Sequence, residues 1–415
     1  MVFDSSHITA LWSAAPMDEK VILIGKAGFI MQERFGLERE LAALGVWQPM
    51  RQYQAAFGGL PVPAFQHIHQ PMKPDPKAEQ WVPDGPEKPL SPLNPGFVDN
   101  VTGQLKIAAG LQAALKNLLT VTPEFKKHLA SKSSEPAKGD RFRIALIDLT
   151  RKKLLDPEFA GWGSTVAEYG ASAVKIAPLY AAFQLLNDLK SLKGPTTVGD
   201  LITAAKKAKF LGPPKFVEFL DPAAAPPNIK FSQPVKEAMM NLLDPKKANC
   251  ASSLLIDKVG FPYVGSVMKK SGLRHPTRGG IWLRWNYGCP KREMWSGADS
   301  RPPPEPVYVH NATALSLATF YTLMAQRRLV TPGSSDKIKS LLTGASWFTD
   351  DAALGPSARV ASKVGIWGKY IHEAALVENA PVRYAVAILT VGIPVPVGFL
   401  NHLIVKLNTL IVANN

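Results

Sequence analysis

The chain has 415 residues, long enough for two or three domains with a substantial core. Its residues are 46% hydrophobic and 20% charged, a composition that argues against intrinsic disorder. Lys and Arg outnumber Asp and Glu by 48 to 33, and the net charge of +15 favours anionic partners. No long basic run is interleaved with aromatic residues, so we do not expect nucleic acid as a partner.

Residues 1–60 are predicted to form an N-terminal helical segment, because apolar residues recur at helical spacing over Glu19–Phe29 and Gln32–Leu44. From Pro61 to Pro95 prolines recur every few residues, which excludes a helix interior or a central strand. Residues 61–101 are therefore predicted to form an extended linker or arm.

The third unit, residues 102–412, begins with a predicted helix at Leu105–Leu119 and a strand at Phe142–Leu149. A tight turn at Thr150–Leu154 is expected to lead into a second strand. A helical subdomain should then occupy about residues 172–345. Its helices are predicted at Ala171–Leu189, Val198–Ala208, Val235–Leu243, Ala251–Lys258, Val264–Lys270, Ala312–Arg328 and Ser334–Leu342.

Strand patterns return near the end of the chain, at Ser357–Val364, Tyr370–Val377 and Val382–Val391, before a closing helix at Val397–Val412. Strands at both ends with helices between them predict an antiparallel sheet assembled from the two chain ends. We therefore expect an α/β fold of the α+β kind, with helices flanking the sheet and an all-helical insertion.

Three features bear on cellular location. Residues 1–7 lack the cationic start and apolar stretch of a secretory signal, so we expect a cytoplasmic protein. The apolar stretches Tyr384–Leu400 and Leu403–Val412 are interrupted by Pro, Gly, Asn or Lys, so we expect a packed terminal helix and no membrane span. The two cysteines, Cys250 and Cys289, define no disulfide framework.

The pair Ser172 and Lys175 is the leading candidate for chemistry. Positions three apart on a helix share a face, so the lysine amine can reach the serine hydroxyl and act as its base. Lysine can do so only when burial or another cation keeps it partly neutral. A helix N-terminus also offers a backbone N–H to a developing oxyanion.

Ser-x-x-Lys alone is a weak motif, since it also occurs at Ser266/Lys269 and Ser334/Lys337. The structural alternative is that Ser172 caps a helix and its lysine partner is solvated. The context of the motif must therefore decide between these interpretations.

That context resembles the serine β-lactamases and penicillin-binding proteins, most of all class A β-lactamases, over about residues 102–412. The strand Ile144–Leu149, the Gly-Trp-Gly approach at 161–163 and the apolar helix opened by Ser172-x-x-Lys175 carry the first part of this resemblance. It implies a β-lactamase/transpeptidase-like fold.

Two further motifs follow in the family's order. Ala248–Gly260 resembles the Ser-Asp-Asn loop and its helix, with Asn249 in the position that holds the lysine and the substrate. Lys363-Val-Gly365 resembles the Lys-Thr-Gly edge strand. The resemblance implies that Lys363 polarises the site, and that the N–H groups of Ser172 and Ile366 form the oxyanion hole.

The sequence departs from the family pattern at three positions. Lys247 stands where a serine shuttles a proton, and it is either a substitute for that serine or a solvated loop charge. Asn286 takes the place of the deacylating glutamate, and an amide cannot accept a proton from water. Val364 replaces a hydroxyl that binds the substrate carboxylate. The glutamates nearby, Glu293 and Glu305, sit in no convincing pattern.

The resemblance implies a serine hydrolase or acyltransferase that forms an acyl-Ser172 intermediate on an amide, ester or lactam, and that is a poor β-lactamase. Gly365, Trp367 and Asn286 would contact a small, anionic substrate. A non-catalytic binding protein of the same fold is the alternative. A biosynthetic enzyme whose first hundred residues cover the site is a third possibility, and the oligomeric state stays open.

No metal or organic cofactor is expected. His67 and His69 could ligate a metal, but no third ligand accompanies them, and surface histidines are the simpler interpretation. Four tryptophans either line a pocket or belong to the core: Trp285, Trp295, Trp347 and Trp367.

Overall fold

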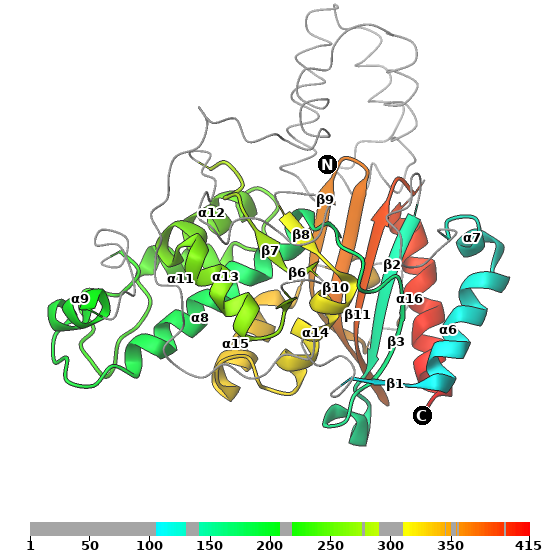
Figure 1. The fold of residues 1–415 in the computed structure, drawn as a ribbon, viewed down its shortest axis with the longest axis horizontal. Helices are drawn as coiled ribbons and strands as arrows, with labels where there is room; N and C mark the ends of the chain where they lie inside the picture. Colours follow the sequence, from blue (N-terminus) through cyan, green and yellow to red (C-terminus); the bar gives the residue numbers. More distant parts are fainter. Residues whose placement is uncertain are drawn as a thin grey trace, which may run out of the picture.

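The computed structural model describes residues 105–129, 141–207, 218–275, 279–289, 310–344, 346–349, 354, 357–393 and 396–415 (Figure 1). The N-terminal segment and the proline-rich arm predicted for residues 1–101 lie outside these residues, as do His67, His69, Glu293, Trp295 and Glu305.

A six-stranded sheet is built from both ends of the described chain, as the strand pattern predicted. Its central pair joins β2 (Arg141–Asp148) antiparallel to β11 (Val382–Val391), two strands more than 200 residues apart in sequence. The sheet order is β1 (Lys106–Ile107), β3 (Glu158–Trp162), β2, β11, β10 (Tyr370–Asn379) and β9 (Arg359–Trp367). Only β1 and β3 pair in parallel among these strands, and β9 is an edge strand.

Alternation along β11 assigns its side chains to two hydrophobic layers. Tyr384, Val386 and Ile388 pack with α6 (Ala109–Val121) and α16 (Pro396–Ala413), which cover one face of the sheet (Figure 1). The alternate residues, Ala385, Ala387 and Leu389, belong to the core on the opposite face. The small alanines let α14 (Ala314–Ala325) pack directly against β11, β2 and β10.

The helices between the two halves of the sheet follow the predicted pattern closely. Beyond the sheet they form a helical body on the side opposite α16 (Figure 1). Their bounds are η2 (Ala171–Lys175), α8 (Ile176–Lys190), α9 (Val198–Lys207), α11 (Gln233–Met240), α12 (Ala248–Val259), α13 (Phe261–Lys270) and α15 (Pro332–Leu342). The remaining short helices are α7 (Pro123–Lys126), η1 (Arg151–Leu154) and η4 (Trp347–Thr349).

Short strands interrupt this helical region, a feature that the sequence analysis did not predict. A three-stranded sheet orders β4 (Glu168–Tyr169), β8 (His310–Ala312) and β7 (Trp282–Leu283), and β5 (Arg274–His275) pairs with β6 (Gly279–Gly280). The small sheet anchors the chain just before the Ser-x-x-Lys turn, because β4 directly precedes it.

Among the described residues, α16 alone is long and apolar enough to cross a membrane by length and composition. Half of its apolar window is buried within the protein, where Phe399, Leu403 and Leu407 pack against the sheet. The helix is therefore a packed terminal helix in this fold.

Candidate active site

Ser172 lies in the 3₁₀ turn η2, between β4 and α8. Side chains three apart in a 3₁₀ turn eclipse one another, so Ser172 and Lys175 share one face. Ser172 is half-buried, whereas the residues on both sides of it are buried. The turn is anchored by the N–H of Gly170, which donates to the carbonyl of His310 at 2.8 Å.

Burial distinguishes this Ser-x-x-Lys pair from the other two. The side chain of Lys175 is 2% exposed, whereas Lys269 and Lys337 are exposed on helix surfaces. The alternative that Lys175 is a solvated helix residue is therefore excluded. Ser172 is also not a helix N-cap, because η2 starts after Gly170 and α8 after Lys175.

The amine of Lys175 is bonded to the residue predicted to hold it. Asn249 lies in the first turn of α12, and its Oδ1 accepts from Lys175 Nζ at 2.5 Å. Burial, aided by the nearby cation of Lys363, holds the pKa of Lys175 well below its ordinary value. Both influences favour the neutral amine, the form that can accept a proton.

Lys363 is the second buried amine of the site. It is 5% exposed on the edge strand β9, and its Nζ donates to the carbonyl of Val364 at 3.1 Å. Burial lowers its pKa to about 8, although the nearby carboxylate of Glu373 opposes this change. Lys363 therefore remains mostly charged at neutral pH.

The edge strand passes directly behind the serine turn at Gly365. A Cβ atom added there would lie 2.8 Å from the N of Ala173 and 3.1 Å from the carbonyl of Gly170. Only glycine allows so close an approach. Trp367 packs in the same small cluster as Tyr169 and Ala171, beside the turn.

Alternation along β9 directs its residues to opposite faces. Val364 and Ile366 pack with the core on the α16 side, together with Trp347, which is a core residue. The Val364 side chain thus lies in the apolar layer on the α16 side of the sheet. The role of the Ile366 N–H in an oxyanion hole stays a prediction, as do the catalytic roles of the other site residues.

Lys247 precedes α12, and its ammonium lies 3.8 Å from the carboxylate of Asp244. Its side chain is 62% exposed. This placement favours a solvated loop charge, and a proton-shuttle role for Lys247 stays a prediction.

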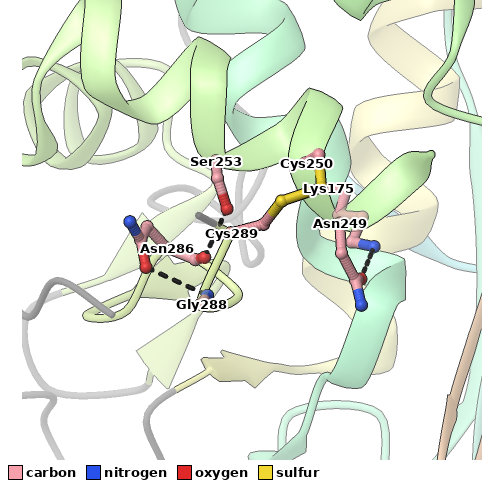
Figure 2. Close-up of a disulfide and its surroundings, with 7 residues drawn as sticks. All are labelled: Lys175, Asn249, Cys250, Ser253, Asn286, Gly288 and Cys289. Carbon is pink, nitrogen blue, oxygen red and sulfur yellow. Dashed lines mark hydrogen bonds between the residues drawn. A yellow bond between two sulfur atoms is a disulfide. The ribbon is translucent and has the colours of Figure 1, made fainter. Parts of the chain in front are cut away.

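A disulfide joins the helix that carries Asn249 to the loop that follows β7. Cys250 and Cys289 are bonded, which the sequence analysis did not foresee. Figure 2 shows this bond between the Lys175–Asn249 pair and Asn286, whose side chain points toward Gly288. The Oδ1 of Asn286 accepts from the N–H of Gly288 at 3.1 Å, and its carbonyl accepts from Ser253 Oγ at 2.8 Å. Asn286 is thus occupied in shaping its own loop.

Two aromatic residues that the sequence analysis missed lie beside Lys175. The ring of Tyr287 faces Lys175 Nζ, 4.4 Å from the ring centroid. His310 stacks on Tyr287 with 4.4 Å between ring centroids, and its Nε2 donates to the carbonyl of Trp285 at 2.9 Å. Burial lowers the pKa of His310 to about 4, so the ring is neutral. No spacing in the sequence could have shown these contacts, which join distant segments.

A second buried histidine, His372, links the residues before the serine turn to the main sheet. His372 Nε2 donates to the carbonyl of Tyr169 at 2.6 Å, and its Nδ1 accepts from the N–H of Thr390 at 3.1 Å. Burial lowers its pKa to about 4, in keeping with this neutral tautomer. Within the described residues, no group of three or more His, Cys, Asp or Glu side chains could hold a metal ion.

The model of a protein family described as the beta-lactamase enzyme family matches residues 132–395. No curated protein matches the chain. Among solved structures the chain is similar to PBP-A, at 16% identity and a TM-score of 0.45, over 74% of this chain and 96% of that one.

It is also similar to a β-lactamase from Sphaerobacter thermophilus DSM 20745, at 16% identity and a TM-score of 0.43, over 73% of this chain and 95% of that one. An ancestral class A β-lactamase matches at 16% identity and a TM-score of 0.43, over 74% of this chain and all of its own length.

Proposed function

This chain belongs to the β-lactamase enzyme family, and we propose that it forms an acyl-enzyme on Ser172 with a small amide, ester or lactam. The observation that carries the proposal is the buried amine of Lys175, which is bonded to Asn249 and whose pKa is held well below its ordinary value by burial and by the nearby Lys363. A lysine that takes part in no reaction would be expected to lie in solvent, because burying its charge costs free energy.

In the proposed reaction, Lys175 accepts the proton of Ser172 Oγ as that oxygen attacks the substrate carbonyl. The N–H groups of Ser172 and Ile366 would hold the resulting oxyanion. The C–N or C–O bond then breaks, the leaving group takes up the proton that Lys175 accepted, and the acyl group remains on Ser172. Lys363 offers its positive charge to an anionic substrate.

The second half-reaction is expected to be slow. No carboxylate stands at Asn286, and its amide is bonded to Gly288. Without that base, water is a poor attacker of the ester. We therefore propose a serine hydrolase with slow turnover, or an acyltransferase that passes the acyl group to another nucleophile. Lys175 is buried and its pKa is lowered, and neither observation favours the alternative of a non-catalytic binding protein.

Burst kinetics with a chromogenic cephalosporin test both halves of this proposal. We expect one equivalent of product per protein in a fast phase, followed by a much slower steady state. Ser172→Ala should abolish the burst. Lys175→Met should slow it by about 10²- to 10⁴-fold, the usual contribution of a general base.

Lys337→Met is the matched control, because it removes the exposed lysine of another Ser-x-x-Lys pair. A burst that survives Ser172→Ala, or that Lys337→Met reduces as much as Lys175→Met does, would contradict the assignment. A steady-state rate as fast as the burst would contradict slow hydrolysis of the acyl-enzyme.

A further inference from the structure

We propose that Tyr287 is a positioning residue for the acylation step, with its ring shielding Lys175 from water and its hydroxyl fixing the turn before Ser172. The inference rests on the proposed function and assigns a role to a residue outside the three motifs. It explains why the loop after β7 is so firmly held although its glutamate position is Asn286.

The ring of Tyr287 occupies the space beside the Lys175 amine. Its centroid lies 4.4 Å from Nζ, close enough to exclude a water molecule from that side. The side-chain oxygen of Asn249, on α12, accepts the hydrogen bond that Nζ donates. An aromatic face and an amide thus lie beside the amine.

The hydroxyl of Tyr287 acts on the serine turn itself. It donates to the carbonyl of Ala171, the residue before Ser172, at 3.2 Å. Burial raises the pKa of Tyr287 well above its ordinary value, so the hydroxyl keeps its proton. Ala171 has φ of +45° and Tyr287 has φ of +60°, a region that side chains other than glycine rarely adopt. One hydrogen bond therefore joins two backbone positions that each need outside support.

The segment around Tyr287 is held at every residue from 285 to 289. The carbonyl of Trp285 accepts from His310, and that of Asn286 accepts from Ser253. The N–H of Gly288 is bonded by Asn286 Oδ1, and Cys289 is tied to α12 by the disulfide. Loops at protein surfaces are seldom fixed so completely, and here the fixed residue at the centre is Tyr287.

The groups that face Lys175 come from several elements. Lys363 approaches from β9, His310 from β8, Asn249 from α12 and Tyr287 from the loop after β7. His310 is neutral and Glu373 acts on Lys363, so the cation of Lys363 is the main charge at Lys175.

The ring has two opposing effects on the amine. It removes water, which favours the neutral form, and its π face attracts the ammonium. Burial is the largest influence on Lys175, so we expect water exclusion to win. Opening the site at residue 287 should therefore raise the pKa of Lys175.

The test compares Tyr287→Ala with Tyr287→Phe by the pH dependence of the acylation rate. Tyr287→Ala should move the acid limb up by at least one pH unit, about a tenfold loss of rate below the midpoint. Tyr287→Phe keeps the ring, so its midpoint should stay unchanged while the rate falls a few-fold. An unchanged or lowered midpoint in Tyr287→Ala would overturn the inference.

Tyr384→Leu is the control for a general loss of stability, because Tyr384 is buried on the α16 side of the sheet. It should lower the melting temperature and leave the midpoint unchanged. Titration of Lys175 through its ¹³Cε signal, assigned by its loss in Lys175→Met, gives a second readout that needs no activity. Absence of acylation in the unaltered protein would reject the proposed function, whereas an unmoved Lys175 titration in Tyr287→Ala would reject the role of Tyr287.

Discussion

At the scale of single residues, the candidate site contains two buried amines with lowered pKa values, that of Lys175 well below its ordinary value and that of Lys363 at about 8. Burial and the charge of Lys363 lower the pKa of Lys175. Burial also lowers the pKa of Lys363, but the carboxylate of Glu373 opposes this change. In the proposed reaction, this difference would let Lys175 act as the base while Lys363 remains a cation. The same principle assigns acid and base roles in other enzymes.

Lys363 predicts a pH dependence of substrate binding. Its cation is present below a pKa of about 8 and is lost as the pH rises through that value. The KM of a carboxylate-bearing probe should therefore rise by about 10- to 100-fold between neutral pH and pH 10, the loss expected for a charged hydrogen bond.

A neutral ester probe is the control, and its KM should change little over the same range. Lys363→Met should remove the dependence for the anionic probe. An equal rise in KM for both probes would contradict a role for the Lys363 charge.

Gly365 predicts a steric effect on the same site. Gly365→Ala places a Cβ 2.8 Å from the Ala173 N, so the edge strand or the serine turn must move. We expect a loss of about 1–3 kcal/mol of unfolding free energy, typical of overpacking, together with impaired acylation.

Gly110→Ala is the matched control, because a Cβ there meets no atom within 4 Å. It should leave acylation unchanged and stability equal or slightly higher. Acylation at the unaltered rate in Gly365→Ala would show that the close approach is not required.

Sequence motifs located Ser172, Lys175, Asn249 and Lys363, because each lies in a local pattern on a recognisable element. They did not locate Tyr287, whose hydroxyl contacts Ala171, a residue 116 positions away. The burial that sets the pKa of Lys175 also arises from long-range packing. Local spacing therefore indicated the candidate reactive groups, whose catalytic roles stay predictions, but not the surroundings that set their pKa values.

At the scale of elements, strand and helix periodicity predicted the long segments well. The bounds of β11 match the prediction at both ends, and α9 ends within one residue of it. The short strands β4 to β8 were missed because two or three residues are too few to show an alternation. These short strands nevertheless position the serine turn.

The disulfide between Cys250 and Cys289 predicts a measurable tether between α12 and the Tyr287 loop. The double variant Cys250→Ser/Cys289→Ser should lose about 2–4 kcal/mol of unfolding free energy. Its acylation rate should also fall, since the loop around Tyr287 becomes less fixed. Reduction of the unaltered protein by a dithiol should reproduce both effects, and denaturant unfolding with burst kinetics measures them.

Dithiol treatment of the double variant is the control and should change nothing. An unaltered stability in that variant would contradict the tether. Disulfides are typical of oxidising compartments, so thiol labelling in cell extracts also bears on the expected cytoplasmic location, which stays a prediction.

At the scale of the whole molecule, a cluster of polar side chains at the end of β2 links the sheet to the last residues of the sequence. Asp148 is fully buried, and it accepts hydrogen bonds from Lys153 at 2.8 Å and from the side chain of Asn415 at 2.8 Å. Burial alone would raise the pKa of Asp148, but these bonds and that from Thr150 hold it below its ordinary value.

Asp148→Asn should therefore lower the unfolding free energy at pH 7 by about 1–3 kcal/mol, the cost of losing charged hydrogen bonds to a buried group, since Lys153 keeps its ion pair with Glu158. In the unaltered protein this contribution is present above the unfolded pKa of about 3.9, and it is lost as the pH falls through the lower folded value. Denaturant unfolding at pH 7 measures the change.

Asp336→Asn is the control, since Asp336 pairs with Arg327 on the surface and both side chains are more than half exposed. It should cost less than about 1 kcal/mol. Equal losses of unfolding free energy in the two variants would contradict the stabilising role of Asp148.

Mass spectrometry of the intact protein after incubation with benzylpenicillin and with a fluorophosphonate probe tests the central claim most directly. We predict a mass increase equal to the whole of benzylpenicillin, or to the fluorophosphonate less HF, located on Ser172 by peptide mapping and absent from Ser172→Ala. The penicillin adduct should persist after removal of free drug. A folded protein that gives no adduct with either probe, or an adduct that remains in Ser172→Ala, would contradict Ser172 as the nucleophile.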